Sequence, residues 1–303
     1  MPRVAPRLLK KALKAHSLLP LLLPACRSIE QSAQEFRWIR NELPNMKQVR
    51  QACLQRFKLV PLQYILGNQP FGELDIVCRP GVLIPRWETE EWVCELSERL
   101  LGSMGPLNSP FPIWDLCCGT GCVGLLLQRR LGPGCSLTAV DVTDAALGLC
   151  VENAHRNDLE RPRLIATDVL TKKIVPDSRI SLLTCNPPYI PKNQFAADTS
   201  PSVKRHEPQL ALIGDLEFYS SLVNTWIHHT DSFVYEVGDR RQIEYVMHGI
   251  RDDPRLQLEW CVGYRLDSSG CPRVVYGYKA ESSLAGALSG YGDLLYIPPG
   301  AGK

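Results

Sequence analysis

The segment Asp115-Leu116-Cys117-Cys118-Gly119-Thr120-Gly121 joins a short apolar run, residues 113–116, to a stretch with helical periodicity, residues 123–131. A short apolar run is typical of a buried strand, and glycines let a backbone approach a ligand closely. The helix that follows offers free N–H groups at its first turn. The strict Gly-x-Gly-x-x-Gly dinucleotide pattern is not met, because Cys117 stands at the first glycine position and its spacing to Gly121 differs. The segment therefore predicts a cofactor loop and disfavours a pyrophosphate site.

Strand-like and helix-like segments alternate after this loop. The strand-like runs are 137–140, 163–166, 180–184, 233–237, 257–262 and 274–278, and the helical patterns are 123–131, 145–156, 218–229 and 242–251. This alternation predicts an α/β fold with a parallel sheet wrapped by helices and a terminal antiparallel pair. Residues 104–112 are expected to form a loop that leads into the first core strand, and the Gly-, Ser- and Ala-rich residues 281–303 are expected to form a flexible tail.

The chain before residue 86 has a different pattern. Residues 29–60 show helical periodicity and predict a small helical domain. In residues 61–85, the runs 75–77 and 82–84 are separated by Arg79-Pro80-Gly81, which predicts a β-hairpin linker. Residues 1–28 contain lysines and arginines but no acidic residue, a composition typical of a mitochondrial targeting segment. The alternative is an ordinary basic helix that stays on the protein. The leucine-rich run 18–23 is too short to span a bilayer, and no membrane insertion is expected.

Composition limits the class of protein. A length of 303 residues suits one large α/β domain, here 86–280, with a small additional domain. A net charge of +2 is far from the basic balance of a protein held to nucleic acid by phosphate contacts. The twelve cysteines include no Cys-x-x-Cys pair, so we expect reduced thiols in an intracellular compartment and no metal site.

Acidic residues follow two of the predicted strands. Asp141 lies twenty residues after Gly121, where a carboxylate in such sheets binds ribose hydroxyls. Asp168 could accept a hydrogen bond from an adenine amine while Val169 packs on the ring. An aspartate after a strand is alternatively a turn or cap residue. At successive strand ends of one sheet edge, these residues together predict a nucleoside site.

The motif Asn186-Pro187-Pro188-Tyr189 follows the fourth strand of the predicted sheet. Two prolines fix the backbone and remove two N–H donors, so the motif offers acceptors, the Asn186 side-chain oxygen among them, and an aromatic ring. Acceptors that hold both hydrogens of a planar –NH2 group favour a pyramidal nitrogen and direct its lone pair at an electrophile. The motif therefore predicts methyl transfer to an amide or a base amine, and the alternative is a rigid turn.

With these motifs the chain resembles the release-factor glutamine-N5 methyltransferase family, and most of all its fungal mitochondrial members. The resemblance implies a Rossmann-like class I methyltransferase sheet that uses S-adenosylmethionine, a helical domain at residues 29–60 that binds the release factor, and a mitochondrial location. It rests on the following blocks: Pro61-Leu62-Gln63-Tyr64-Ile65-Leu66-Gly67, Leu83-Ile84-Pro85-Arg86, Glu88-Thr89-Glu90, the Asp115 to Gly121 loop, Asn186 to Tyr189, Glu207-Pro208 and Ala211-Leu212.

The resemblance also implies roles for individual residues. Cys117, Cys118, Gly119, Thr120 and Gly121 would wrap the methionine part of the cofactor, Asp141 would bind the ribose, and Asp168 with Val169 the adenine. Asn186 and the backbone of Pro187 and Pro188 would hold the substrate amide, and Asn186 would also contact the cofactor. Tyr189, Glu207 and Pro208 would line the glutamine pocket. Two departures from the family pattern are Cys117 in place of a glycine and His206 in place of an aromatic residue before Glu-Pro.

The implied substrate is the glutamine of a Gly-Gly-Gln loop in a class 1 peptide-chain release factor. Lys47, Arg50, Arg56 and Lys58 are candidate contacts with this partner or, alternatively, a solvated helix face. The main rival function is methylation of adenine N6 or cytosine N4 in nucleic acid, since the same acceptors suit those amines. An oxidoreductase and a non-catalytic scaffold are less consistent with the motifs. We expect a monomer with no stable nucleic-acid binding.

Overall fold

The computed structural model describes residues 4–104, 110–171 and 174–299. The chain folds into two compact units. The helical unit comprises the chain up to Gln69, Cys78–Ile84 and Ala196–Pro208, and the sheet unit comprises Pro70–Val77, Pro85–Phe195 and the chain from Gln209 onward. These units do not follow the expected boundaries, because residues 196–208 join the helices instead of the sheet domain.

The helical unit is built from short amphipathic helices around a small core. Three of them have side-chain N-caps: Ser28 accepts from the Gln31 N–H and Asn45 from the Gln48 N–H, each at 3.0 Å, and Ser200 accepts from the Val203 N–H at 3.3 Å. The buried residues of the core include Leu22, Ile39 and Cys53. The helices of this unit are α1 (Pro6–Ala15), α2 (Leu19–Cys26), α3 (Ile29–Glu42), α4 (Met46–Phe57), α5 (Leu62–Leu66) and α10 (Pro201–His206).

The first two helices belong to this core. Ala12 from α1 and Leu22 and Leu23 from α2 are fully buried in the same cluster as Phe36 and Ile39 of α3. Cleavage after residue 28 would remove Ala12, Leu22 and Leu23 from the core. The targeting segment expected at residues 1–28 stays a prediction, and in the structure this part of the chain has a packing role.

The hairpin predicted between 75–77 and 82–84 lies earlier in the chain. β1 (Asn68–Phe71) and β2 (Leu74–Val77) form a two-stranded sheet, with Gly72 at the turn in the left-handed region, φ +56°. Residues 82–84 are not a strand, so that part of the prediction was wrong. Backbone groups of these residues form hydrogen bonds with side chains and not with a neighbouring strand. The Tyr64 hydroxyl donates to the Val82 carbonyl at 2.7 Å, and the Ile84 N–H donates to the Glu207 carboxylate at 3.3 Å.

The sheet unit contains one eight-stranded sheet in the order β10-β8-β9-β7-β6-β3-β4-β5. Neighbouring strands are parallel in the part β7-β6-β3-β4-β5. β9, β8 and β10 complete the sheet with antiparallel pairs. This confirms the expected parallel sheet with an antiparallel end. The strands are β3 (Phe111–Leu116), β4 (Cys135–Asp141), β5 (Arg163–Ala166), β6 (Leu182–Cys185), β7 (Ser232–Glu236), β8 (Trp260–Leu266), β9 (Pro272–Lys279) and β10 (Asp293–Tyr296).

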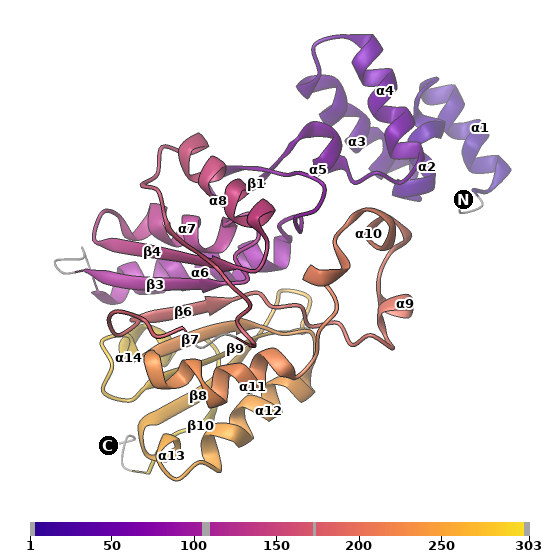
Figure 1. Ribbon diagram of the computed structural model, residues 1–303. Helices are drawn as coiled ribbons and strands as arrows, with labels where there is room; N and C mark the ends of the chain where they lie inside the picture. Colours follow the sequence, from indigo (N-terminus) through magenta and orange to yellow (C-terminus); the bar gives the residue numbers. More distant parts are fainter. Residues whose placement is uncertain (1–3, 105–109, 172–173, 300–303) are drawn as a thin grey trace. The chain divides into compact units, whose positions relative to one another are not determined.

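Helices cover both faces of this sheet (Figure 1). Successive strand residues alternate between the two cores: Phe233 and Tyr235 of β7 pack in one cluster and Val234 in the other. One cluster contains residues of α6, α7, α8 and α14, and the other contains residues of α11 and α12. The helices of the sheet unit are α6 (Trp87–Met104), α7 (Cys122–Leu131), α8 (Asp144–Arg156), α11 (Glu217–Asn224), α12 (Arg240–Arg251), α13 (Leu256–Glu259) and α14 (Ala285–Leu288), with 3₁₀ turns at η1 (Gln209–Ala211) and η2 (Trp226–His229). The short helix α9 (Phe195–Asp198) begins at the last residue of one sheet-unit segment, and its other residues belong to the helical unit.

Two segments of the sheet unit differ from the sequence-based expectations. The strand expected at 257–262 begins at Trp260, because the preceding residues form the short helix α13. The turn before this helix is held by the Asp253 carboxylate, which accepts from the Arg255 and Leu256 N–H groups. The helix expected at 218–229 divides into α11 and η2. Of the loop expected at 104–112, residues 105–109 lie outside the described residues.

The flexible tail expected at residues 281–303 was also wrong over most of its length. Leu284, Leu288 and Tyr291 are buried, and the Tyr291 hydroxyl donates to the Trp92 carbonyl at 3.0 Å. β10 then pairs with β8, with Leu294 opposite Gly263. Among the described residues, no helix is long and apolar enough to cross a membrane.

Candidate active site

The loop after β3 has the backbone of a ligand cradle. Cys117, Gly119 and Gly121 have φ values of +53°, +54° and +80°. At Gly121 a Cβ would lie 2.5 Å from the Cys150 Sγ, so this position has no room for a side chain. Cys117 adopts the left-handed conformation without being a glycine, which is where the chain departs from the family pattern. The loop therefore keeps the glycine-like turn although its first glycine is replaced.

Neighbouring side chains hold this loop in place. The Asp141 carboxylate at the end of β4 accepts from the Gly119 N–H at 3.0 Å and from the Thr143 N–H at 3.0 Å. The buried Asn153 amide donates to the Thr120 carbonyl at 2.9 Å. An ionised carboxylate has about four acceptor positions, so Asp141 retains acceptor capacity for a hydroxyl ligand. Thr120 and Cys118 are buried, and Cys117 and Gly119 are half-buried.

Asp115 lies under the loop and is almost fully buried. Its carboxyl group accepts from the Gly124 N–H at 3.1 Å and from the Thr184 hydroxyl at 2.8 Å. Desolvation raises the pKa of Asp115 to about 7, although both hydrogen bonds lower it. Asp115 thereby connects β3 with the first turn of α7 and with β6.

Asp168 acts as a turn residue in the structure. Its two carboxyl oxygens accept from the Leu170 N–H at 2.9 Å and from the Thr171 hydroxyl at 3.0 Å. Val169 is buried, and its carbonyl accepts from the Ser221 hydroxyl at 2.9 Å. Asp168 is therefore a turn residue, as the alternative proposed. A contact of Asp168 and Val169 with adenine stays a prediction.

The Asn186-Pro187-Pro188-Tyr189 motif begins directly after β6. Parallel pairing of β3 with β6 sets Leu116 beside Cys185, so the cofactor loop and the motif leave the sheet at the same edge. Pro187 and Pro188 are buried, whereas Asn186 and Tyr189 are half-buried. A Cβ at Gly214 would lie 2.3 Å from the Pro188 carbonyl oxygen, which shows how closely the following chain packs on the motif.

A buried carboxylate behind the motif was not predicted from the sequence. Glu236, at the end of β7, has no exposed surface and accepts from the Thr89 hydroxyl at 2.7 Å, the Trp92 indole at 2.8 Å and the Tyr189 hydroxyl at 3.1 Å. Arg273 Nη1 lies 3.9 Å from the Glu236 Oε1. Desolvation raises the pKa of Glu236, while these donors and Arg273 lower it. The sequence contained one pointer to this carboxylate, the Glu88-Thr89-Glu90 block, because its Thr89 is a hydrogen-bond donor to Glu236. No role was predicted for that block.

Glu207 and Pro208 belong to the helical unit. Glu207 is buried and accepts from the Ile84 N–H at 3.3 Å, which joins two of the sequence blocks that carry the resemblance. His206 Nε2 lies 3.4 Å from the Lys58 carbonyl oxygen, and Arg205 is exposed. The structure thus gives this segment a role within the helical unit, and its contact with a substrate stays a prediction.

The four basic candidates for partner binding differ in their surroundings. Arg56 is an internal residue, since its guanidinium pairs with Glu35 at 2.7 Å and donates to the Val60 carbonyl at 3.1 Å. Lys47, Arg50 and Lys58 are exposed. The prediction of a partner contact therefore does not suit Arg56, whose charge is already neutralised inside the unit.

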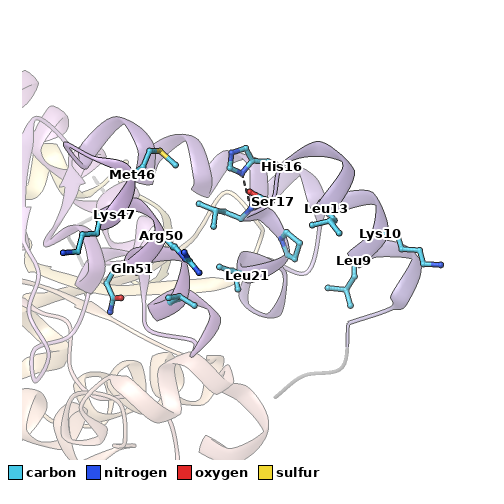
Figure 2. Close-up of a pocket in the computed structure, with 13 residues that line it drawn as sticks. Leu9, Lys10, Leu13, His16, Ser17, Leu21, Met46, Lys47, Arg50 and Gln51 are labelled. Carbon is cyan, nitrogen blue, oxygen red and sulfur yellow. Dashed lines mark hydrogen bonds between the residues drawn. The ribbon is translucent and has the colours of Figure 1, made fainter.

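Lys47 and Arg50 line a groove of about 1140 Å³ in the helical unit, which we call the α1–α4 groove. Its floor and walls include Leu9, Leu13 and Leu21, and Figure 2 shows Lys10 and Lys47 extending away from it at opposite ends. The full lining comprises Leu9, Lys10, Leu13, His16, Ser17, Leu18, Pro20, Leu21, Met46, Lys47, Arg50, Gln51 and Leu54. It is an apolar surface with a basic margin.

Comparison with known proteins agrees with the geometry of the sheet unit. The family model named methyltransferase small domain matches residues 98–206. Among solved structures, the catalytic domain of human Mettl16 in complex with an RNA hairpin has a TM-score of 0.55 at 17% identity, over 80% of this chain and 92% of that one. At that identity the likeness concerns the fold alone, which is a class I methyltransferase fold.

Similarity over nearly the whole chain is found among curated proteins. The mitochondrial MRF1 N(5)-glutamine methyltransferase MTQ1 of Saccharomyces cerevisiae is 48% identical over 92% of this chain and 90% of its own length. The probable MRF1 mitochondrial N(5)-glutamine methyltransferase of Schizosaccharomyces pombe is 34% identical over 89% and 95%. The human MTRF1L release factor glutamine methyltransferase is 32% identical over 75% and 70%. With this similarity and a class I methyltransferase sheet that carries Asn186-Pro187-Pro188-Tyr189 at the carboxyl ends of its parallel strands, the chain belongs to the release factor glutamine methyltransferase family.

Proposed function

We propose that this protein transfers a methyl group from S-adenosylmethionine to the N5 side-chain nitrogen of the glutamine in the Gly-Gly-Gln loop of a mitochondrial class 1 peptide-chain release factor. The observation that carries the proposal is the 48% identity, over 92% of the chain, to a protein named for that reaction on MRF1. The acceptor geometry of the Asn186 motif supports the same chemistry. The mitochondrial location is supported by the names of the two fungal relatives.

The cofactor loop suits S-adenosylmethionine, which supplies a sulfonium methyl group as the electrophile. The left-handed turn at Gly119 and Gly121 lets the backbone approach a ligand, and no phosphate-binding glycine pattern is present in that segment. We assign Cys117 to Gly121 to the methionine part of the cofactor, Asp141 to the ribose, and Asp168 with Val169 to the adenine.

The substrate nitrogen needs help because its lone pair is delocalised into the amide. The Asn186 side-chain oxygen and the backbone of Pro187 and Pro188 are assigned to hold its two hydrogens, so that the lone pair points at the methyl carbon. Bound S-adenosylmethionine would supply the methyl group and leave as S-adenosylhomocysteine, and the proton released from the methylated nitrogen would pass to solvent water. Positioning and stabilisation of the developing charge are the contributions of these acceptors. Tyr189 is assigned to the glutamine pocket, and a contribution from Glu207 and Pro208 stays a prediction.

The catalytic assignment is tested by replacing Asn186 with alanine. We expect methyl transfer to a recombinant release factor to be lost, while S-adenosylmethionine binding, measured by isothermal titration calorimetry, stays within about threefold of the unaltered protein, because the lost contact acts on the substrate amide. Full transfer by the Asn186→Ala variant would contradict the assignment.

The α1–α4 groove is our candidate for holding the body of the release factor. Its apolar lining and its basic margin suit an apolar protein surface with acidic neighbours. Leu13 is 61% exposed in the groove, and Leu258, on the sheet unit, is 63% exposed and serves as a matched control. We expect Leu13→Asp to raise the KM for the release factor at unchanged kcat and Leu258→Asp to change neither. Equal effects of the two substitutions would contradict a docking role for the groove.

A further inference from the structure

The motif Asn186 to Tyr189 is held at both ends by one buried carboxylate. Tyr189 donates directly to Glu236 Oε1 at 3.1 Å. At the other end, the Asn186 Nδ2 group donates to the Thr89 hydroxyl oxygen at 3.2 Å, and the Thr89 hydroxyl donates to Glu236 Oε2 at 2.7 Å. These residues all lie in the sheet unit, although 147 positions of sequence separate Thr89 from Glu236.

The donors around Glu236 fix the direction of this chain of hydrogen bonds. The Trp92 indole N–H, which can only donate, lies 2.8 Å from the same Oε2 atom that Thr89 contacts. Thr89 and Trp92 are three positions apart on α6, so both face the carboxylate from one side of the helix. The hydrogen bonds from Thr89, Trp92 and Tyr189 are all accepted by Glu236, so the Thr89 hydrogen is committed to the carboxylate. The Thr89 oxygen is then left as an acceptor.

An accepting Thr89 oxygen decides how the Asn186 amide is oriented. It attracts the –NH2 side of the amide and repels the carbonyl side, so Oδ1 is the end of the side chain that is left for a substrate. The opposite orientation would set two acceptors against each other at Thr89 and present an –NH2 group to the –NH2 group of the substrate glutamine. An asparagine amide has two nearly isosteric orientations, and only one of them suits this reaction.

From this arrangement we propose that Thr89 is a positioning residue, which fixes the orientation of the Asn186 side-chain amide through the buried Glu236 carboxylate. The inference rests on the proposed function, because it supplies the reason why Asn186 presents an oxygen to the substrate. Neither Thr89 nor Glu236 touches the reacting atoms. Arg273, whose Nη1 lies 3.9 Å from Glu236 Oε1, provides a positive charge near the carboxylate.

The kinetic test compares Thr89→Val, which keeps the shape and removes the hydroxyl, with Thr89→Ser, which keeps the hydroxyl. We expect Thr89→Val to lower kcat by about 10- to 100-fold, because small errors of position cost rate, with the KM for S-adenosylmethionine within about twofold. Thr89→Ser is expected to restore most of kcat. The control is Thr230→Val, since Thr230 is also fully buried and hydrogen-bonded, to the Ser232 carbonyl at 2.7 Å, and lies outside the site. It should lose comparable stability in a thermal melt and keep its kcat.

A second measurement is independent of the substrate. Selective ¹⁵N labelling of asparagine, with Asn186→Ala to assign the signal, reports the side-chain amide of Asn186 directly by NMR. We expect slow proton exchange of this amide in the unaltered protein and in Thr89→Ser, and fast exchange in Thr89→Val. Unchanged exchange in Thr89→Val, or a kcat equal to that of Thr230→Val, would overturn the inference. A protein that shows the NMR effect but methylates no release factor would instead refute the proposed function.

Discussion

Replacing Gly121 with alanine tests the physical account of the cofactor loop. The new Cβ would lie 2.5 Å from Cys150 Sγ and 3.1 Å from Leu125 Cδ1, and the position has φ +80°. The left-handed conformation costs roughly 1 to 2 kcal/mol for an alanine. Overpacking of a buried site costs about 1 to 3 kcal/mol, and the stiffer unfolded chain offsets roughly 0.4 to 1 kcal/mol. The sum is a destabilisation of about 1 to 5 kcal/mol, which denaturant unfolding followed by tryptophan fluorescence measures.

Two further variants separate the contributions. Cys150→Ala removes the sulfur that the new Cβ meets, so Gly121→Ala with Cys150→Ala should be less destabilised than the sum of the single changes, by about 1 to 3 kcal/mol. Gly148→Ala, in the middle of α8 with nothing within 4 Å of its added Cβ, should instead stabilise by roughly 0.5 to 1 kcal/mol. A Gly121→Ala protein as stable as the unaltered one, or strictly additive double-variant energies, would refute the reasoning about this loop.

Two other predictions concern Asp115 and the N-terminal helices. Because burial raises the pKa of Asp115 to about 7, well above its ordinary value, the stability that its proton contributes is fully present below about pH 4 and is lost as the pH rises through 7. Between about pH 5 and 8 the unaltered protein should therefore lose roughly 2 to 3 kcal/mol more unfolding free energy than Asp115→Asn, and parallel denaturation curves across this range would contradict the buried acid. Deleting residues 1–27 should unfold the helical unit, because Ala12, Leu19, Leu22, Leu23 and Cys26 leave its core. Circular dichroism and limited proteolysis check this, and undiminished protease resistance of the remaining helices would show that α1 and α2 are dispensable.

The parallel part of the sheet could be predicted from sequence because its strands are short apolar runs, and those of β3, β4 and β7 are followed by a helical period. The run at 163–166 matches β5 residue for residue, and β3 and β4 extend only slightly beyond their predicted runs. The errors occurred where local pattern and tertiary contacts disagree. The Arg79-Pro80-Gly81 turn suggested a hairpin, but the residues after it bond to Tyr64 and Glu207 instead of a neighbouring strand.

The C-terminal segment shows a second limit of sequence reasoning. Its Gly, Ser and Ala content suggested flexibility, yet Leu284, Leu288 and Tyr291 anchor it on α6 and the sheet. A few large apolar side chains determined the outcome more than the average composition did.

The sequence motifs of the candidate site were predicted, but the buried residues that hold the Asn186 to Tyr189 motif in place were not. Asn186 and the cofactor loop are recognisable from local patterns of proline and glycine. Thr89 stood in the Glu88-Thr89-Glu90 block without a role. Glu236 was not recognisable, because only the fold brings this carboxylate at the end of β7 together with its donors from α6 and from the segment after β6. Arg56 shows the converse error, since an arginine counted as a surface contact pairs internally with Glu35.

The central claim is tested most directly by mass spectrometry of a recombinant mitochondrial class 1 release factor after incubation with this protein and S-adenosylmethionine. The account predicts one added methyl group on the glutamine of the Gly-Gly-Gln loop, absent when Asn186→Ala replaces the unaltered protein. An unmodified glutamine, together with methylation of adenine or cytosine in a nucleic-acid control, would contradict it.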